Sequence, residues 1–317
     1  MIALVISKLD YHWYARFALA AYVLSYVLMI AVALMGKDSH GSRRWLNIGG
    51  ITFQPTEFVK IVLIVLLATV VTQMGKKINS PRAVGLVVLI TVPIAGLVAA
   101  NNLSSGIIIM GIGFFMLFVA CRKSWPFFLC GFAAAGAMAV AGPLAKALEM
   151  MKLLKPYQLE RIYVWLDPEA YPMDGGFQVL QGLYAIGSGW LVGKGFGESI
   201  QKMGFVPEAL NDYIFAIICE ELGLFGAVSV ILIFLFLIYR FMLIASNAPD
   251  LFGSLLVVGV MGHIAIQVIL NIAVVTNSIP NTGITLPFIS YGGTSVLFLM
   301  IEMGMVLSVS NQIKLEK

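Results

Sequence analysis

The run Leu222-Gly-Leu-Phe-Gly-Ala-Val-Ser-Val-Ile-Leu-Ile-Phe-Leu-Phe-Leu-Ile-Tyr239 extends over 18 residues without a charged side chain. As a helix it would be about 27 Å long, close to the thickness of the hydrocarbon core of a bilayer. Comparable runs recur along the chain, whose 317 residues are 60% hydrophobic and only 11% Asp, Glu, Lys or Arg. So few charges cannot cover the surface of two soluble domains. The sequence therefore predicts an all-α, polytopic integral membrane protein, a bundle of transmembrane helices.

Eight segments are long and apolar enough to be predicted membrane spans, namely 12–35, 54–74, 83–100, 105–121, 125–148, 212–240, 251–275 and 284–310. Only one connection is long, because residues 149–211 are rich in Gly, Pro and charges and too polar to be embedded. A loop of that length in a compact membrane protein is usually functional. We therefore expect residues 1–317 to form a single membrane domain with one large loop.

The Lys and Arg residues indicate the orientation in the membrane. Ten lie in one set of alternate loops and at the C-terminus, Lys8, Arg16, Lys76, Lys77, Arg82, Arg122, Lys123, Arg240, Lys314 and Lys317, whereas the opposite short loops hold three, Lys37, Arg43 and Arg44. Because basic loops stay in the cytoplasm, we expect a cytoplasmic C-terminus and an extracytoplasmic 149–211 loop. The net charge of +4 then requires no nucleic-acid partner. The adjacent Arg43 and Arg44, on the disfavoured side, suggest an anion-binding site.

Charged side chains enter a predicted span in Gln54-Pro-Thr-Glu57-Phe-Val-Lys60. Glu57 lies three residues before Lys60, so the two share a helix face in the favourable order. An internal ion pair would let both side chains enter the membrane. The same pair would also suit a polar cavity that a headgroup or an ion can reach, and the spacing does not separate these two interpretations.

The predicted span 212–240 begins with an acid, in Pro207-Glu-Ala-Leu-Asn-Asp212-Tyr. Asp212 would stabilise the start of a helix as a cap, or it would exchange protons as a reactive group at the water boundary, and the sequence leaves both open. Glu220 lies about 12 Å deeper along the same helix, too far to form a carboxylate dyad with Asp212. Glu220 and Glu221 are therefore expected to be internal hydrogen-bonding or ion-pair groups.

Irregular backbone is expected where the last predicted span begins. Residues 277–295 contain two prolines, several glycines and many hydroxyl groups, which predicts a broken helix entry packed against protein or lining a cavity. His263 and Glu302 each stand alone in a predicted span. A lone intramembrane His or Glu is most often satisfied by a hydrogen bond to another helix, so neither is assigned a function.

At this point five stretches, taken in order, resemble the signatures of a known family. They are Gly41 to Lys60 with its Ser-Arg-Arg-Trp beginning, Arg161-Ile-Tyr-Val-Trp-Leu-Asp-Pro168, Gly193-Lys-Gly-Phe-Gly-Glu-Ser-Ile-Gln-Lys202, Pro207 to Gly223, and Leu286-Pro-Phe-Ile-Ser-Tyr-Gly-Gly293. The family is SEDS, for shape, elongation, division and sporulation, which comprises FtsW, RodA and SpoVE. The resemblance runs from about residue 9 to residue 312, and within the family it is closer to the FtsW and SpoVE branch than to RodA.

The resemblance implies a peptidoglycan glycosyltransferase that polymerises lipid II at the outer face of the bacterial plasma membrane, for cell division, cell shape or sporulation. The family's essential acid falls on Asp212, its outer arginine motif on Arg43 and Arg44, and its membrane ion pair on Glu57 and Lys60. In the implied mechanism Asp212 is the general base that takes the proton from the acceptor sugar's 4-hydroxyl. That hydroxyl attacks the anomeric carbon of the donor, and the new β-1,4 bond forms with inversion as undecaprenyl pyrophosphate leaves.

Other residues are assigned supporting roles. Lys202 and Glu208 are candidates for binding substrate beside Arg43 and Arg44, and Glu220, Glu221 and Ser290 are candidates for supporting the site. No metal-ligand cluster is visible, and the odd number of widely spaced cysteines supports neither a disulfide framework nor a metal site. A divalent cation, Mg²⁺ or Mn²⁺, would therefore be shared between the pyrophosphate and an acid such as Asp212. Its identity stays unknown.

The expected partners are lipid II, the undecaprenyl-pyrophosphate-linked glycan, membrane lipids and a class B penicillin-binding protein, a transpeptidase. Two other functions remain open, a lipid II flippase and a non-catalytic scaffold for the transpeptidase. A proton-coupled transporter would place its acid near the bilayer midplane, whereas Asp212 is expected at the outer boundary, which favours chemistry. Family members usually have ten spans, and residues 1–7 resemble the end of the second, so the chain is expected to lack the first two.

Overall fold

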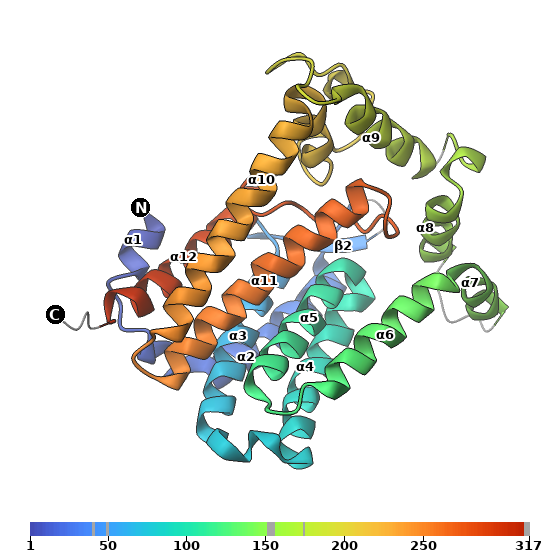
Figure 1. Cartoon of the computed structure of the whole chain (residues 1–317). Helices are drawn as coiled ribbons and strands as arrows, with labels where there is room; N and C mark the ends of the chain where they lie inside the picture. Colours follow the sequence, from blue (N-terminus) through green and yellow to red (C-terminus); the bar gives the residue numbers. More distant parts are fainter. Residues whose placement is uncertain (40–41, 49–50, 151–155, 174, 314–317) are drawn as a thin grey trace. The chain divides into compact units, whose positions relative to one another are not determined.

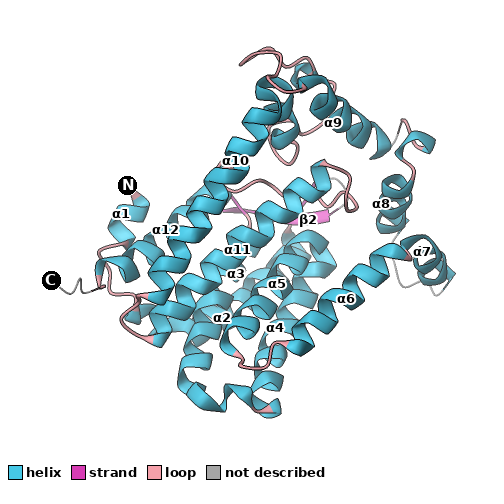
Figure 2. Ribbon diagram, viewed as in Figure 1, coloured by secondary structure: helices cyan, strands magenta, loops and turns pink. Residues whose placement is uncertain are grey.

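The computed structural model describes every residue except 40–41, 49–50, 151–155, 174 and 314–317. Helices dominate the described residues, and three short strands form one sheet in the order β1-β2-β3 (Figures 1 and 2). The antiparallel pairings are β1 with β2 and β2 with β3. The predicted all-α membrane fold is confirmed, apart from this small sheet between two spans.

The helices are α1 (Ile2–Ile6), α2 (His12–Met35), α3 (Pro55–Met74), α4 (Pro81–Asn101), α5 (Leu103–Ala120), α6 (Trp125–Ala139), α7 (Ala141–Met150), α8 (Pro156–Leu166), α9 (Gly175–Gly189), α10 (Ile214–Ser246), α11 (Leu251–Val275) and α12 (Gly293–Asn311). Three 3-10 helices are η1 (Gly75–Asn79), η2 (Pro168–Ala170) and η3 (Gln201–Met203). The strands are β1 (Lys37–Ser39), β2 (Ser42–Ile48) and β3 (Ile51–Phe53).

The chain divides into two compact units. Unit 1 comprises residues 1–123, 235–266 and 292–317, and unit 2 comprises residues 124–234 and 267–291. Each unit therefore combines segments that are far apart in the sequence. The expectation of a single membrane domain stays a prediction.

Unit 1 is built around α3, most of whose side chains are buried. α2 and α5 pack against α3, and α4 packs against α5 (Figure 1). Two glycines of α11 allow close helix packing, because a Cβ at Gly259 would collide with Ile64 of α3 and a Cβ at Gly262 with Phe115 of α5. The hydrophobic effect does not hold helices together inside a membrane. Small residues at such crossings let the helices approach closely, and the resulting van der Waals contacts stabilise the packing.

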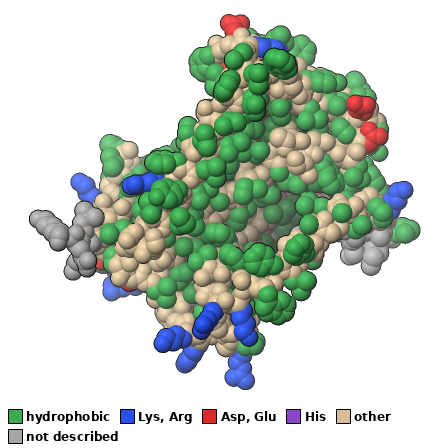
Figure 3. All heavy atoms as spheres, viewed as in Figure 1, with side chains coloured by type: hydrophobic (Ala, Val, Ile, Leu, Met, Phe, Trp, Pro, Cys, Tyr) green, Lys and Arg blue, Asp and Glu red, His purple; other side chains and the backbone are tan. Residues whose placement is uncertain are grey.

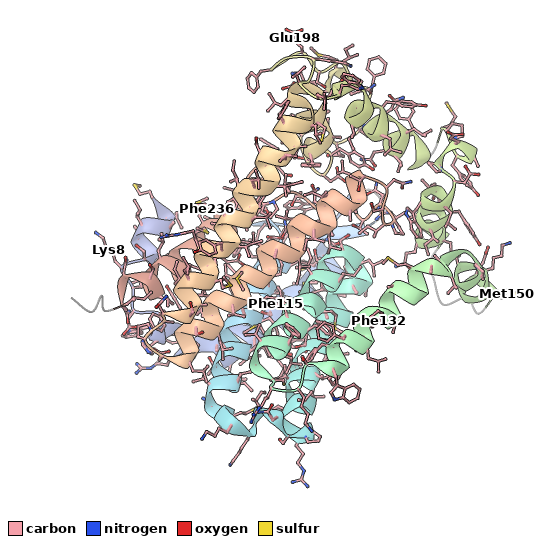
Figure 4. The ribbon with its side chains drawn as sticks, viewed as in Figure 1. Lys8, Phe115, Phe132, Met150, Glu198 and Phe236 are labelled. Carbon is pink, nitrogen blue, oxygen red and sulfur yellow. The ribbon has the colours of Figure 1, made fainter. Side chains whose placement is uncertain are left out.

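Seven of the described helices are long and apolar enough to cross a membrane. They match seven of the eight predicted spans. Hydrophobic side chains cover much of the helical surface, and basic side chains gather at the η1 end of unit 1, where Lys76 and Lys77 lie (Figure 3). Exposed Phe236 on α10 is one example of an apolar side chain on the outside of a span (Figure 4).

The prediction of one continuous span at 125–148 was wrong. The structure has α6, which ends at Ala139, and the separate ten-residue helix α7, with the break at Val140. Pro143 explains the break, since the proline ring clashes with the carbonyl group four residues earlier, at Ala139, and lacks the N–H that would bond to it. With 15 residues, α6 is about 22 Å long, shorter than the hydrocarbon core.

The last predicted span, 284–310, begins later than expected, because α12 starts at Gly293. Residues 276–292 form an irregular segment without α-helix or strand. Pro287 and the Gly292-Gly293 pair explain why no helix forms there, since proline lacks a donor and glycine weakens a helix. The irregular entry predicted for this region is present, and residues 276–291 of it belong to unit 2.

α10 is interrupted at Gly223, where φ is 63° and ψ is −160°. The loop after α9 supplies the hydrogen bonds that the break removes. The N–H groups of Leu224 and Phe225 donate to the carbonyls of Trp190 and Leu191, at 2.8 and 3.2 Å. In exchange, the carbonyls of Glu220 and Glu221 accept from the N–H groups of Lys194 and Gly195, at 2.9 and 3.0 Å. Few main-chain groups of the break are thus left unsatisfied inside the membrane protein.

Unit 1 contains two buried pairs of ionisable groups. Lys60 Nζ lies 2.8 Å from Glu57 Oε1 on α3, so the pair that the spacing predicts is formed. His263 Nδ1 on α11 lies 2.9 Å from both carboxylate oxygens of Glu302 on α12. All four residues are less than 9% exposed. Each of these four ionisable groups has a partner, as groups of high desolvation cost require.

Candidate active site

Asp212 lies in unit 2, in the segment that leads into α10. α10 begins at Ile214, and the two residues before it, Asp212 and Tyr213, are 7% and 0% exposed. The turn that precedes them is tight, because Glu208 has a φ of 55° and its carboxylate accepts a hydrogen bond from the side chain of Asn211. A buried acid that directly follows a tight turn has few alternative positions.

The irregular 276–292 segment is bonded to the main chain beside Asp212. Ser290 Oγ donates to the carbonyl of Asn211 at 2.5 Å and accepts from Leu286 N–H at 2.7 Å. The N–H of Tyr291 donates to the carbonyl of Leu210 at 2.9 Å. The structure thus brings together two sites predicted separately, Asp212 and the broken helix entry that contains Ser290.

A glycine faces the Asp212 carboxylate. Gly283 has a φ of 67°, and a Cβ built on it would lie 3.6 Å from Asp212 Oδ2. That φ favours glycine, because other residues pay a steric cost there. The absence of a side chain leaves space beside the carboxylate, which an incoming group can use.

Tyr213, which follows Asp212, relates this segment of the chain to α9 and α8. The ring of Tyr213 lies against Gly182 of α9, where a Cβ would collide with the ring edge. Burial raises the pKa of the Tyr213 phenol, the negative charge of Asp212 adds to the increase, and the positive charge of Arg161 on α8 opposes it. Arg161 therefore lies within electrostatic range of the segment that carries the acid.

Arg161 is a residue that sequence reasoning missed as a candidate. It stood in a quoted family stretch but was not singled out, because a single Arg in a long polar loop has no distinctive spacing. The structure adds the reason to consider it. α8 is joined to the 276–292 segment by Trp165, whose Nε1–H donates to the carbonyl of Asn277 at 3.0 Å, while Asn277 Nδ2 donates to the carbonyl of Trp165 at 3.3 Å.

Glu220 and Glu221 are internal ion-pair partners at the break in α10. Glu220 is 0% exposed. Its Oε1 lies 2.6 Å from Lys194 Nζ, and its Oε2 accepts from Ser199 Oγ at 2.5 Å. Glu221 Oε1 lies 2.6 Å from Lys202 Nζ, which also donates to the carbonyl of Gly197 at 2.7 Å. Lys202, predicted to bind substrate, therefore has internal partners that the sequence did not indicate.

The remaining predicted site residues belong to unit 1. Arg43 and Arg44 lie in β2, with Arg43 opposite Asp38 of β1, and their side chains lie outside the described part of the structure. Glu57 and Lys60 lie in the first turns of α3. The geometry of unit 2 therefore groups Asp212, Glu208 and Ser290. The two arginines and the Glu57–Lys60 pair stay predictions as parts of the same site.

Metal binding has limited support from side chains alone. Among the residues that the structure describes, no group of three or more His, Cys, Asp or Glu side chains is placed to hold a metal ion. A cation shared between Asp212 and substrate phosphates stays a prediction. An apolar cavity of about 220 Å³ lies in unit 2 between α6, α7 and α8, with Met138, Ile162 and Trp165 in its lining, and its surface suits hydrocarbon.

A protein-family model matches nearly the whole chain. The family described as "Cell cycle protein", whose model is named for FtsW, RodA and SpoVE, matches residues 1–315. The Stage V sporulation protein E of Bacillus subtilis is 37% identical over 310 residues, which are 96% of this chain and 82% of that protein. The "Probable peptidoglycan glycosyltransferase FtsW" of Coxiella burnetii is 33% identical over 316 residues, 98% of this chain and 82% of that protein.

Solved structures give the same fold. One chain is from the structure described as "Structural coordination of polymerization and crosslinking by a peptidoglycan synthase complex", with a TM-score of 0.78 and 28% identity, covering 99% of this chain and 87% of that chain. The rod shape determining protein RodA of Thermus thermophilus has a TM-score of 0.69 and 24% identity, covering 99% and 84%. The second likeness shows a RodA-like fold.

Proposed function

The chain belongs to the FtsW, RodA and SpoVE family of cell cycle proteins, and from that premise we propose that it is a peptidoglycan glycosyltransferase. It polymerises lipid II into glycan strands at the outer face of the bacterial plasma membrane. Relatives that share a third of its sequence carry the name of this activity. Its use is cell division or sporulation, which the family description "Cell cycle protein" and the name of the sporulation relative support.

One observation carries the proposal, the arrangement around Asp212. The acid is almost fully buried, its carbonyl accepts a hydrogen bond from Asn271 of α11, and a glycine leaves space beside its carboxylate. A general base needs a fixed position and an open side from which the reacting hydroxyl approaches. Asp212 meets both requirements, whereas Glu220 and Glu221 are occupied by lysines.

In the proposed mechanism the Asp212 carboxylate accepts the proton of the acceptor sugar's 4-hydroxyl. The oxygen attacks the anomeric carbon of the donor's muramyl sugar, the bond from that carbon to the pyrophosphate oxygen breaks, and the configuration inverts. The leaving undecaprenyl pyrophosphate gains negative charge, which cationic groups must neutralise. Arg161 is the cation that the structure supports best, because its charge acts on the phenol of Tyr213, the residue that follows Asp212. Arg43 and Arg44 are further candidates, as is a divalent cation bound with the phosphates.

The proposal of catalysis at the outer face has its support in the charge pattern of the sequence. The distribution of Lys and Arg predicts a cytoplasmic C-terminus, with residues 149–211 and the start of α10 outside. The site then faces the compartment in which the glycan accumulates. The apolar cavity beside Trp165 offers a surface for part of a prenyl chain. A class B penicillin-binding protein is the proposed partner, since one similar chain is from a peptidoglycan synthase complex that combines polymerisation with crosslinking.

The test is lipid II polymerisation by the purified chain in nanodiscs with its transpeptidase partner, beside Asp212→Ala and Asp212→Asn. We expect glycan from the wild type and a loss of about 100-fold to 10,000-fold in both variants, the contribution of a general base. Melting temperatures close to that of the wild type would show that the variants are folded. Full polymerisation by folded Asp212→Asn would contradict the assignment of the base.

Transport of lipid II is the second candidate, because buried ionisable pairs within spans are typical of transporters. Glu57 with Lys60 and His263 with Glu302 are two such pairs in unit 1. Translocation of labelled lipid II in liposomes separates the two functions. A flippase keeps its translocation rate in Asp212→Ala and loses it in Glu57→Gln, whereas a polymerase that does not transport shows no translocation in any form.

A further inference from the structure

Asn271 is a fully buried amide of α11 that lies against the main chain of Asp212. Its exposure is 0%, and its Nδ2 donates to the carbonyl oxygens of Asp212 and Ile284, both at 2.7 Å. Two carbonyl oxygens accept only from the NH₂ end of an amide, so these contacts fix the orientation of the side chain. Its Oδ1 has no hydrogen-bond donor among the described residues. The polar contacts of Asn271 therefore come from its two donor hydrogens.

These two hydrogen bonds join the two segments that form the site. Asp212 leads into α10, and Ile284 directly follows Gly283, the glycine that faces the Asp212 carboxylate. Both carbonyls belong to irregular backbone, which has no ladder of helix or sheet hydrogen bonds to hold it. α11 is a regular helix over 25 residues. One side chain on a regular helix thus bonds to both segments, and it adds to the hydrogen bonds of Ser290 and Tyr291 that also join them.

We propose that Asn271 is a positioning residue for the general base, an inference that rests on the function proposed above. It holds the main chain of Asp212 and of Ile284 at a fixed separation, so that the carboxylate faces the space left by Gly283. Asn271 acts through Asp212 and touches no reacting atom. Because a displacement of about 1 Å in a catalytic geometry lowers rates by about 100-fold, its loss lowers kcat and leaves KM nearly unchanged.

The sharpest test is Asn271→Asp, which replaces the NH₂ group by an oxygen with almost no change in shape. The new oxygen faces two carbonyls and cannot donate to them as a carboxylate. Asn271→Ala is the second variant, which removes the amide without adding a charge. In lipid II polymerisation by the full chain with its transpeptidase partner, we expect kcat to fall about 10-fold to 100-fold in both variants.

Asn277→Asp is the matched control. It makes the same substitution of Asn by Asp. It also removes an amide donor, because Asn277 Nδ2 donates to the carbonyl of Trp165 on α8 at 3.3 Å. Aspartate tolerates the positive φ of 53° at this position about as well as asparagine. We expect its kcat to stay within about threefold of the wild type. Melting temperatures of all variants, measured in the same nanodiscs, correct each rate for the folded fraction.

The outcomes separate this inference from the proposed function. If the wild type makes glycan, Asp212→Asn does not, and both folded Asn271 variants match the wild type in kcat, the positioning role is wrong and the function stands. Equal losses of kcat in Asn271→Asp and Asn277→Asp would also overturn it, since they would indicate a general effect on the segment. If the wild type makes no glycan under conditions in which a related polymerase does, the proposed function itself fails.

Discussion

At the scale of single residues, the site depends on a side chain that is absent. Gly283 combines a φ of 67° with a position 3.6 Å, measured from its ideal Cβ, from Asp212 Oδ2. A methyl group at that distance makes an ordinary contact, whereas a longer side chain would occupy the space beside the carboxylate. Backbone strain and access to the acid are therefore separable by the size of the substituent.

We predict that Gly283→Ala lowers the free energy of unfolding by about 1 kcal/mol, the cost of a left-handed backbone for alanine, and retains most of the activity. Gly283→Leu should abolish polymerisation, because its side chain fills the space beside Asp212. Lipid II polymerisation and melting temperature together check both statements. Gly204→Ala is the control, since Gly204 also has a positive φ, 112°, but a Cβ there would meet no atom within 4 Å. Activity in folded Gly283→Leu would contradict the prediction.

At the scale of elements, hydropathy predicted the spans well and their interruptions poorly. The spans 54–74 and 251–275 differ from α3 and α11 by no more than one residue. The span 125–148 was wrong because average hydropathy does not weigh a single proline, and Pro143 ends α6 at Ala139. In the same way, Gly223 did not signal a break, since glycine is common in membrane helices.

Gly223 permits the break in α10, and we predict that Gly223→Ala is strongly destabilising. A φ of 63° with a ψ of −160° is accessible almost only to glycine, and a Cβ there would collide with main-chain atoms of Leu191 and Gly193. The two effects together cost about 3 kcal/mol or more. Melting temperature and the yield of folded protein in detergent measure the loss.

Gly131→Ala is the comparison for that measurement. Gly131 lies inside α6, and a Cβ built there meets no atom within 4 Å. Replacing a glycine in a regular helix by alanine stabilises it by about 0.5–1 kcal/mol, so the two substitutions should shift the melting temperature in opposite directions. A Gly223→Ala protein as stable as the wild type would show that the loop after α9 is not needed to complete α10.

At the scale of the whole molecule, the limit of sequence reasoning is which distant segments meet. Asp212 and the irregular region before α12 were each predicted as unusual, yet nothing in either stretch showed that they are bonded to each other. Asn271 was missed because it stands in an apolar helix with no motif of its own, and its role depends on two carbonyls from other segments. Residue type and spacing predict helices, whereas such contacts follow from the packing of the chain.

The same kind of long-range contact stabilises unit 1 where α2 and α11 begin and α12 ends. Tyr11 is 0% exposed and its hydroxyl donates to Asp250 Oδ2 at 2.5 Å, just before α11 begins. Ser308 Oγ of α12 donates to the carbonyl of Leu9 at 2.5 Å. Burial opposes ionisation of Asp250, but hydrogen bonds from Tyr11 and from the N–H of Gly253, with the charge of His12, hold its pKa below the usual 3.8.

We therefore predict that Asp250→Asn lowers the melting temperature at pH 7 by about 2–4 °C. A lowered pKa in the folded state means that the ionised carboxylate stabilises the protein above pH 3.8, and that this contribution is lost as the pH falls through the folded value. The difference between the wild type and the variant that is measured at pH 5 should decrease below pH 3.8. Since His12 also bonds to Asp10, Asp10→Asn is measured in parallel as the control. If the lower melting temperature of Asp250→Asn persisted unchanged at pH 3, the charge of Asp250 would not be the source of the stabilisation.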